Sequence, residues 1–283
     1  MSGITADRVK ELRESSGAGI MDCKRALAAT GGDLQKSIEF LRKEGVLKAA
    51  KKVGRATLEG LIGIGISKGT AALVEVNCET DFVARTDNFQ NFLAALAETI
   101  LRDKPKGLHQ LQTLKLGHQS VAEALAQLIA RVGENMSVRR FGLLEAGPGE
   151  VIGSYLHAGA KIGAIVRIRG EGVNEALARD IAMHVAAMTP HYIDRKQVPE
   201  AILIREKEIL RATPEINAKP ENLRDKIIDG KLNRYYAENC LLEQPFVKDP
   251  SGKKNVGSFL RDQAPKAEVV QIARFQVGEE GVS

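Results

Sequence analysis

The chain has 283 residues, 43% of them hydrophobic, and its 41 Lys and Arg against 36 Asp and Glu give a formal charge of +5 at pH 7. This length and apolar content suffice for a sizeable core and favour more than one folding unit. A small basic excess spread among many acids argues against direct nucleic-acid binding, which usually needs Lys and Arg gathered on one face. No segment is apolar over the length that crosses a bilayer, so we expect a cytoplasmic protein with no membrane partner.

Residue patterns typical of metal sites and catalysis are missing. The three cysteines form no CxxC pair, and the five histidines include no HxxxH or HExxH pair. The glycines of residues 61–66 match neither GxGxxG nor GxxxxGKS or GxxxxGKT, the loops that hold phosphates, and no GxSxG sequence occurs. These absences predict no metal site and favour a protein without a cofactor or enzymatic activity, but an enzyme whose site carries none of these motifs stays open as an alternative.

Residues 1–50 are predicted to form three helices. Thr5 is a good N-cap, so a first helix runs from about residue 6 to Ser15. A second short helix stops at Gly31-Gly32, and Asp33 caps a third that carries an apolar stripe. Residues 48–52 then read as a charged helical tail or linker that leads out of this unit.

From residue 58 the hydrophobic pattern becomes that of strands. Residues 61–66 and 72–76 flank a turn at 67–70 and predict a β-hairpin. A polar loop over 77–84, a helix from Thr86 to Ile100, a helix that starts with a Ser120 and Glu123 capping box, and a strand over 137–145 follow.

The same order of elements then recurs. A second hairpin over residues 151–168 precedes a helix that ends at Thr189-Pro190. Residues 199–210 and 221–242 read as two charged helices of an antiparallel arm, and a strand over 269–277 returns to the second sheet. The pattern predicts an α+β fold with a duplicated hairpin-plus-helix core.

The loop Thr80-Asp81-Phe82 places an aromatic residue beside an acid in a polar connection. The chain has only eight Phe and no Trp. Phe82 either covers the core of the hairpin or serves as an aromatic anchor for a pocket of a partner. The residues alone leave both interpretations open.

At this loop the sequence resembles the bacterial elongation factor Ts family. The matching segments are Asn77-Cys78-Glu79-Thr80-Asp81-Phe82-Val83-Ala84, residues 17–27, residues 181–187 and Glu243-Gln244-Pro245-Phe246-Val247. They occur in the order of the family from about residue 4 to 278. Several long matches in order are a far more specific signal than a single glycine motif.

The resemblance implies a layout of four parts. Residues 1–54 would be a ubiquitin-associated-like three-helix domain, and 55–145 the N-terminal half of the core. Residues 146–190 with 243–283 would be the C-terminal half, and the inserted helical-hairpin arm over 191–242 is a candidate dimerisation surface.

The resemblance also implies a function and a partner. Family members are guanine-nucleotide exchange factors for elongation factor Tu, which they meet in its GDP-bound and nucleotide-free states. The implied partner-binding residues are Met21 and Lys24 in the first domain, Thr80, Asp81, Phe82 and Val83 in a loop that displaces Mg²⁺, His157 in the second half, and Phe246 and Val247.

Two departures limit the transfer of these roles. Some members continue into a C-terminal helix, whereas this sequence ends at Ser283, and Glu79 stands where some members carry Gln. A nucleic-acid-binding protein, suggested only by the pI near 9.0, and an enzyme with a site between the core repeats remain as alternatives.

Overall fold

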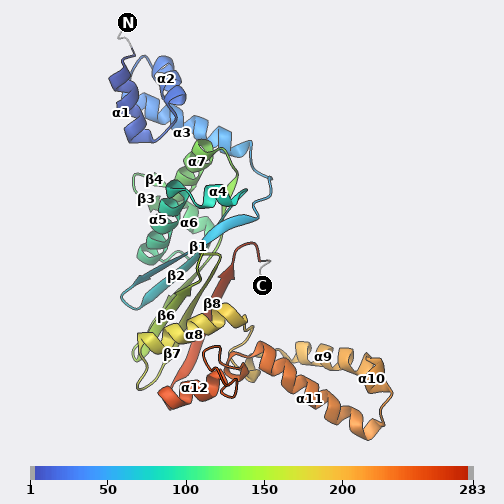
Figure 1. Cartoon of the computed structure of the whole chain (residues 1–283). Helices are drawn as coiled ribbons and strands as arrows, with labels where there is room; N and C mark the ends of the chain where they lie inside the picture. The colour runs from blue at the N-terminus through green and yellow to red at the C-terminus, as the bar shows by residue number, and fades with distance from the viewer. Residues whose placement is uncertain (1–3, 280–283) are drawn as a thin grey trace.

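The structure, a computed structural model, describes residues 4–279. Figure 1 shows an elongated molecule with three helices at the N-terminal end, two sheets with their helices in the middle, and a helical arm that projects sideways at the other end. Both three-stranded sheets are antiparallel, so the mixed helix and sheet class expected from the sequence is found. Residues 1–3 and 280–283, the outermost residues of the expected N-terminal domain and of the expected C-terminal half of the core, lie outside the described residues.

The N-terminal module consists of α1 (Ala6–Ser16), α2 (Ile20–Ala29) and α3 (Leu34–Ala50). As expected, Thr5 caps α1 by accepting a hydrogen bond from the N–H of Arg8, and Asp33 caps α3 in the same way. The module has a small core of buried side chains: Val9, Leu12, Cys23, Ala26 and Leu27.

Helix α3 also packs against the rest of the molecule. It lies along α7 (Val121–Val132), where a Cβ added at Gly45 would be 3.8 Å from the side chain of Ala130. Ala49 belongs to the core of the first sheet, and Arg42 forms an ion pair with Glu123. Residues 48–50, expected in a charged helical tail or linker, are helical, but they form the last turn of a helix that is packed against the core.

The first sheet has the strand order β1 (Glu59–Ser67), β2 (Thr70–Cys78) and β5 (Met136–Glu145). The turn between β1 and β2 is made by Lys68 and Gly69 with φ of 36° and 77°, as a two-residue hairpin requires. The connection from β2 to β5 contains four helices and a short ladder: α4 (Asp81–Ala84), α5 (Asp87–Asp103), α6 (Leu108–Thr113), β3 (Lys115–Leu116), β4 (Gln119–Ser120) and α7.

The second sheet has the order β6 (Glu150–Leu156), β7 (Ile162–Arg169) and β8 (Glu268–Gln276), and α8 (Glu175–Met188) covers one face. The middle strands of the two sheets share an irregularity. The pairing shifts between Glu75 and Val76 on β2 and between Arg167 and Ile168 on β7. Each shift leaves one extra residue on the third strand of its sheet, Arg139 of β5 and Val270 of β8, as in a β-bulge.

The two sheets pack face to face between two layers of helices. Val74 of β2 belongs to the core under α5 and α7, whereas Leu73 belongs to the cluster between the sheets. On β7, Val166 packs under α8 and Ile165 joins Leu73 between the sheets. Because strand side chains alternate, both middle strands are buried on both faces, and this fixes how the halves sit on each other.

The arm follows α8 and precedes β8 in the chain. It contains η1 (Arg195–Gln197), α9 (Glu200–Ala212), α10 (Pro214–Asn217) and α11 (Glu221–Asn239), and η2 (Leu241–Glu243) and α12 (Val256–Gln263) lead back to the sheet. Its small core contains Ile216, Ile228 and Leu232. The proposed domain boundaries stay a prediction. Within residues 4–279, no helix combines the length and the apolar character that spanning a bilayer requires.

Candidate functional site

A single helical turn directly after the first hairpin carries the loop singled out in the sequence. Thr80 caps α4, since its hydroxyl oxygen accepts a hydrogen bond from the N–H of Val83 at 3.5 Å. Phe82 is 78% exposed, whereas Val83 is 9% exposed and packs into the first core. The interpretation in which Phe82 covers the hairpin core is therefore wrong. The side chain of Val83 anchors the turn, and a contact of Val83 with a partner stays a prediction.

Asp81 lies beside this ring in an exposed ion pair. Its carboxylate is 2.8 Å from Nη2 of Arg85, one turn further along the chain. The Arg85 side chain is largely in solvent, so the pair adds little to stability and can exchange partners at small cost. A second protein can thus compete for either charge.

Glu79, the residue that departs from some family members, has its carboxylate engaged within the protein. Its Oε1 accepts a hydrogen bond from the N–H of Asn135 at 2.5 Å and lies 3.5 Å from Nη1 of Arg55. Its charge is therefore used within the protein.

His157 reaches the same region from the second half. It begins the turn between β6 and β7, and this turn is fastened to β1. The N–H of Ile62 donates to the carbonyl of Ala160 at 2.7 Å, and Nζ of Lys161 donates to the carbonyl of Gly60 at 2.9 Å. The exposed ring of His157 is consequently held at the junction of the two halves.

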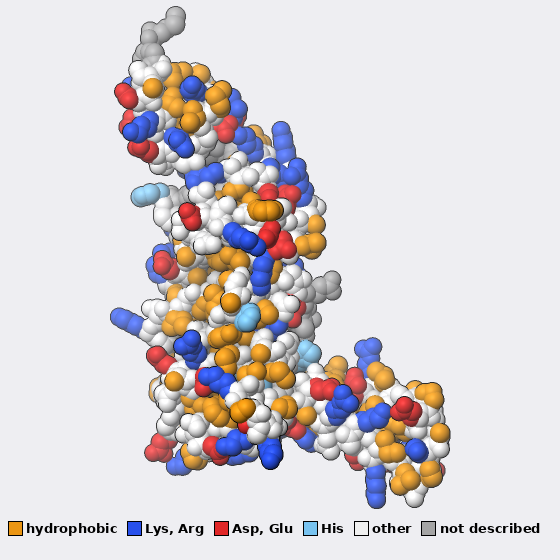
Figure 2. Space-filling model, in the orientation of Figure 1, with side chains coloured by type: hydrophobic (Ala, Val, Ile, Leu, Met, Phe, Trp, Pro, Cys, Tyr) orange, Lys and Arg blue, Asp and Glu red, His pale blue; other side chains and the backbone are white. Residues whose placement is uncertain are grey.

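A groove with a volume of about 760 Å³ lies between these elements. It is lined by residues 61–64 of β1, by α4 and α5, and by the turn 156–161, and it includes Asp81, Arg85 and His157. Figure 2 shows hydrophobic side chains gathered over this middle part of the molecule, with a histidine side chain among them. The fold thus brings two of the sequence-predicted residues, from different halves, to one groove.

Met21 and Lys24 lie on α2 in the N-terminal module. Met21 is 73% exposed, its neighbour Ile20 is also exposed, and Lys24 points to solvent. Adjacent exposed apolar side chains are typical of a protein-protein contact. Neither Met21 nor Lys24 lines the groove, so a partner that uses all these residues has to contact the module and the core together.

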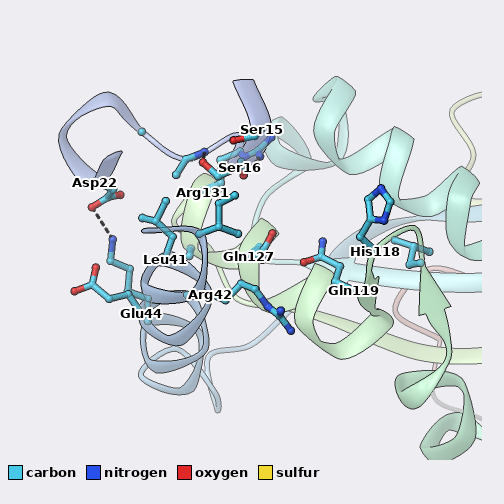
Figure 3. A pocket seen from close by; sticks show the side chains of 17 residues that line it. Ser15, Ser16, Asp22, Leu41, Arg42, Glu44, His118, Gln119, Gln127 and Arg131 are labelled. Carbon is cyan, nitrogen blue, oxygen red and sulfur yellow. Dashed lines mark hydrogen bonds and ion pairs between the residues drawn. The ribbon is translucent and has the colours of Figure 1, made fainter. Parts of the chain in front are cut away.

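A second cavity, of about 280 Å³, lies where the module meets α7. Figure 3 shows Arg131 beside Ser15 and Ser16 at the end of α1, and Asp22 joined to a lysine side chain. Nη2 of Arg131 donates to the carbonyl of Ser16 at 3.2 Å, and Nζ of Lys48 donates to Asp22 at 3.1 Å. Because these charged groups have partners within the chain, we interpret the cavity as the joint that orients the module.

Phe246 and Val247 differ from each other. Phe246 is 5% exposed, and its ring is stacked on that of Phe259 with the centroids 4.0 Å apart. The ring of Phe246 therefore fills the core of the second half, and the contact of this residue with a partner stays a prediction that its burial does not favour. Val247 is half exposed, but its N–H donates to Nδ1 of His184 and it lies outside the groove.

The described part of the chain offers no metal site and adds one residue that the sequence did not indicate. Within residues 4–279, no group of three or more His, Cys, Asp or Glu side chains is placed to hold a metal ion. Glu134, in the connection between α7 and β5, contacts Thr80. No local pattern marks such a long-range contact, which only the fold creates.

Comparison with known proteins gives a consistent result. A family model described as elongation factor TS matches residues 79–279. A protein named elongation factor Ts from Thioalkalivibrio sulfidiphilus is 46% identical over 278 residues, which cover 98% of this chain and 92% of the relative. Proteins of the same name from Prosthecochloris aestuarii and Pediococcus pentosaceus are 43% and 42% identical, and the matches cover 98% and 99% of this chain and 100% and 94% of the relatives. The chain therefore belongs to the elongation factor Ts family.

Proposed function

We propose that this chain is a guanine-nucleotide exchange factor for elongation factor Tu in translation elongation, and not a catalyst of a chemical reaction. Membership of the elongation factor Ts family supports this role and supports neither a nucleic-acid-binding nor an enzymatic alternative. The observation that carries the mechanism is Phe82, which is 78% exposed on a capped helical turn. Exposed aromatic side chains held in one place are the residues that dominate many interfaces.

In the proposed complex, Phe82 inserts between helices of the GTPase G domain. GDP is held largely by its phosphates and by the Mg²⁺ ion that neutralises them, so a shift of the residues around the ion weakens nucleotide binding. Asp81 adds a negative charge near that ion, while Thr80 and Val83 fix the turn. Met21 and Lys24 grip the same domain from the module, His157 approaches it across the groove, and Val247 is a further contact.

Nucleotide exchange then follows from linkage. If the factor weakens the binding of nucleotide to the GTPase, nucleotide weakens the binding of the factor by the same free energy. Incoming GTP can therefore release the factor for another cycle. This scheme needs complementary surfaces and no cofactor.

Phe82→Ala tests the proposal. The change should leave the free energy of unfolding within about 0.7 kcal/mol of the parent, because roughly a fifth of the ring is buried and complete burial contributes about 3 kcal/mol. Stopped-flow release of a fluorescent GDP analogue should slow by about 30-fold, the effect of a ~2 kcal/mol interface residue.

Ile66→Ala is the matched control. It removes another exposed apolar side chain of the same half, at the far end of β1, and should leave release unchanged. Equal release rates for Phe82→Ala and the parent would exclude Phe82 as the wedge.

The role of the ion needs a separate measurement. With EDTA present, spontaneous GDP release speeds up, so the acceleration by the factor should shrink and Asp81→Ala should differ less from the parent. An acceleration that is the same with and without Mg²⁺ would rule out ion displacement, although exchange by another route would stand.

Two further features of the proposal concern the cell and the oligomer. An exchange factor for translation works in the cytoplasm, and three buried free thiols fit a reducing compartment.

Homodimerisation through the arm is supported by the exposed Ile204 and Ile209 of α9 and Leu223 of α11. Light scattering of the full chain and of the triple change of these three residues to Ser decides whether the arm pairs.

A further inference from the structure

The connection between α7 and β5 holds the start of α4 (Asp81–Ala84), called the wedge turn here because it carries Phe82, the proposed wedge. Glu134 lies in this connection, and both of its carboxylate oxygens are directed at one residue. Oε2 accepts a hydrogen bond from the backbone N–H of Thr80 at 3.0 Å, and Oε1 accepts one from the Thr80 hydroxyl at 2.6 Å. Within residues 4–279 the carboxylate of Glu134 has no Lys, Arg or His partner within 4 Å, so these contacts are its main interaction.

Thr80 is fixed on its remaining side as well. Its carbonyl oxygen accepts a hydrogen bond from the thiol of Cys78 at 3.1 Å. Burial, and next the negative charge of Glu134, raise the pKa of Cys78 to about 11, so the thiol stays protonated and can donate. Thr80 therefore has its N–H, its hydroxyl and its carbonyl all engaged directly before α4 begins.

The next residue of the connection, Asn135, adds two hydrogen bonds in which the connection is the donor. The N–H of Asn135 donates to Glu79 at 2.5 Å, and its side-chain amide donates to the carbonyl of Arg55 at 2.8 Å. The residues before Phe82 are thus tied at two consecutive positions to a segment more than fifty residues away, as the separations of 54 and 56 residues show. Such ties limit the directions in which α4 can point.

We propose that Glu134 is a positioning residue for nucleotide exchange, which holds Thr80 so that α4 presents Phe82 in one orientation. The inference rests on the proposed wedge role of Phe82. A side chain that is already ordered loses less conformational freedom on binding, so the complex gains the free energy that ordering would otherwise cost. Glu134 does not itself touch the partner in this scheme and acts through Thr80.

A double-mutant cycle between Glu134 and Phe82 tests the proposal. Glu134→Ala in the full chain should lower the acceleration of GDP release by about tenfold. This is less than the full contribution of two hydrogen bonds to a charged group, because the substitution loosens the orientation of Phe82 but leaves its side chain in place. In a Phe82→Ala background the same substitution should change release by less than about twofold, because residues that act as a unit are not additive. Glu134→Gln keeps one carbonyl oxygen and should fall between Ala and the parent.

Two measurements separate positioning from a general loss of structure. In hydrogen exchange, the amides of Thr80 and Val83 should lose protection in Glu134→Ala while those of β2 and β5 keep theirs. Glu268→Ala, which removes an exposed carboxylate from β8, is the charge control and should alter neither readout. If the alanine variant does not fold, the Gln variant is used for the complete cycle.

The outcomes distinguish this inference from the proposed function. If Phe82→Ala slows release but the Glu134 variants do not, or if the two effects add in full, the positioning role is overturned and the wedge stands. If Phe82→Ala leaves release unchanged, both are overturned. Full protection of the Thr80 amide in Glu134→Ala would also overturn the positioning role.

Discussion

Phe246→Ala should destabilise the protein strongly, although sequence similarity suggested a contact with the partner. The ring is 5% exposed, so its truncation removes nearly the whole transfer free energy of a buried Phe, about 1.5–3 kcal/mol. The stacked pair with Phe259, centroids 4.0 Å apart, adds about 0.5–1.5 kcal/mol. With the cavity left behind, we expect a loss of about 3–5 kcal/mol in the free energy of unfolding.

Urea unfolding followed by circular dichroism measures this loss, and the midpoint of thermal unfolding should fall by roughly 2–4 °C for each kcal/mol. Phe82→Ala is the matched control, because it truncates the same side chain where it is 78% exposed. Folded Phe246→Ala, measured well below the midpoint of its thermal unfolding, should accelerate GDP release about as much as the parent does. A loss of stability below about 1 kcal/mol combined with slow exchange would refute the burial argument and return Phe246 to the interface.

Two other predictions test buried contacts. Burial lowers the pKa of His184 below its usual value of 6.5, and Nδ1 of the neutral ring accepts a hydrogen bond from the N–H of Val247. The neutral ring therefore stabilises the folded protein in full above pH 6.5, and this stabilisation is lost as the pH falls below that value. As the pH falls, the free energy of unfolding should then drop by up to about 1.4 kcal/mol per pH unit, and His184→Gln should remove this slope. The same slope in His184→Gln and the parent would refute the prediction. Gly17→Ala should destabilise more than Gly31→Ala in urea, although φ is 62° and 64°, because only the Cβ at Gly17 would lie 1.5 Å from Arg131. The difference between the two losses in the free energy of unfolding should be about 0.5–1.5 kcal/mol, the contribution of one hydrogen bond. Equal losses would mean that the contact of Arg131 with the end of α1 contributes nothing.

Local signals in the sequence predicted much of the secondary structure. Thr5 and Asp33 cap helices where expected, and the Ser120 and Glu123 capping box forms with both hydrogen bonds present. The two-residue turn at Lys68 and Gly69 also follows from the sequence, since few residues adopt a positive φ in succession. These features depend on residues within four positions of each other, so no knowledge of the tertiary fold was needed.

Packing between distant segments was not predictable in the same way. Residues 48–50 read as a charged helical tail that leads away from the module, because their sequence says nothing about α7, on which the helix lies. Phe82 and Phe246 both stand in segments that match the family, yet one is exposed and the other is stacked in a core. Glu134 carries no motif. The burial of a side chain and the partner of a carboxylate are decided by which elements meet, and a single sequence does not contain that information in local form.

Exchange by binding alone depends on how separate contact surfaces are placed relative to one another, and packing fixes that placement here. The N-terminal module is tied to α7 through Arg131, and the segment that follows α7 holds Thr80 through Glu134. On the other side of the groove, the turn that carries His157 is hydrogen bonded to β1. Because α7 supports both the module and the wedge turn, a partner would meet Met21, Phe82 and His157 as one ordered array. Little of the free energy of binding is then needed to order the factor. The rest of that binding free energy can stabilise the conformation of the GTPase that binds nucleotide weakly.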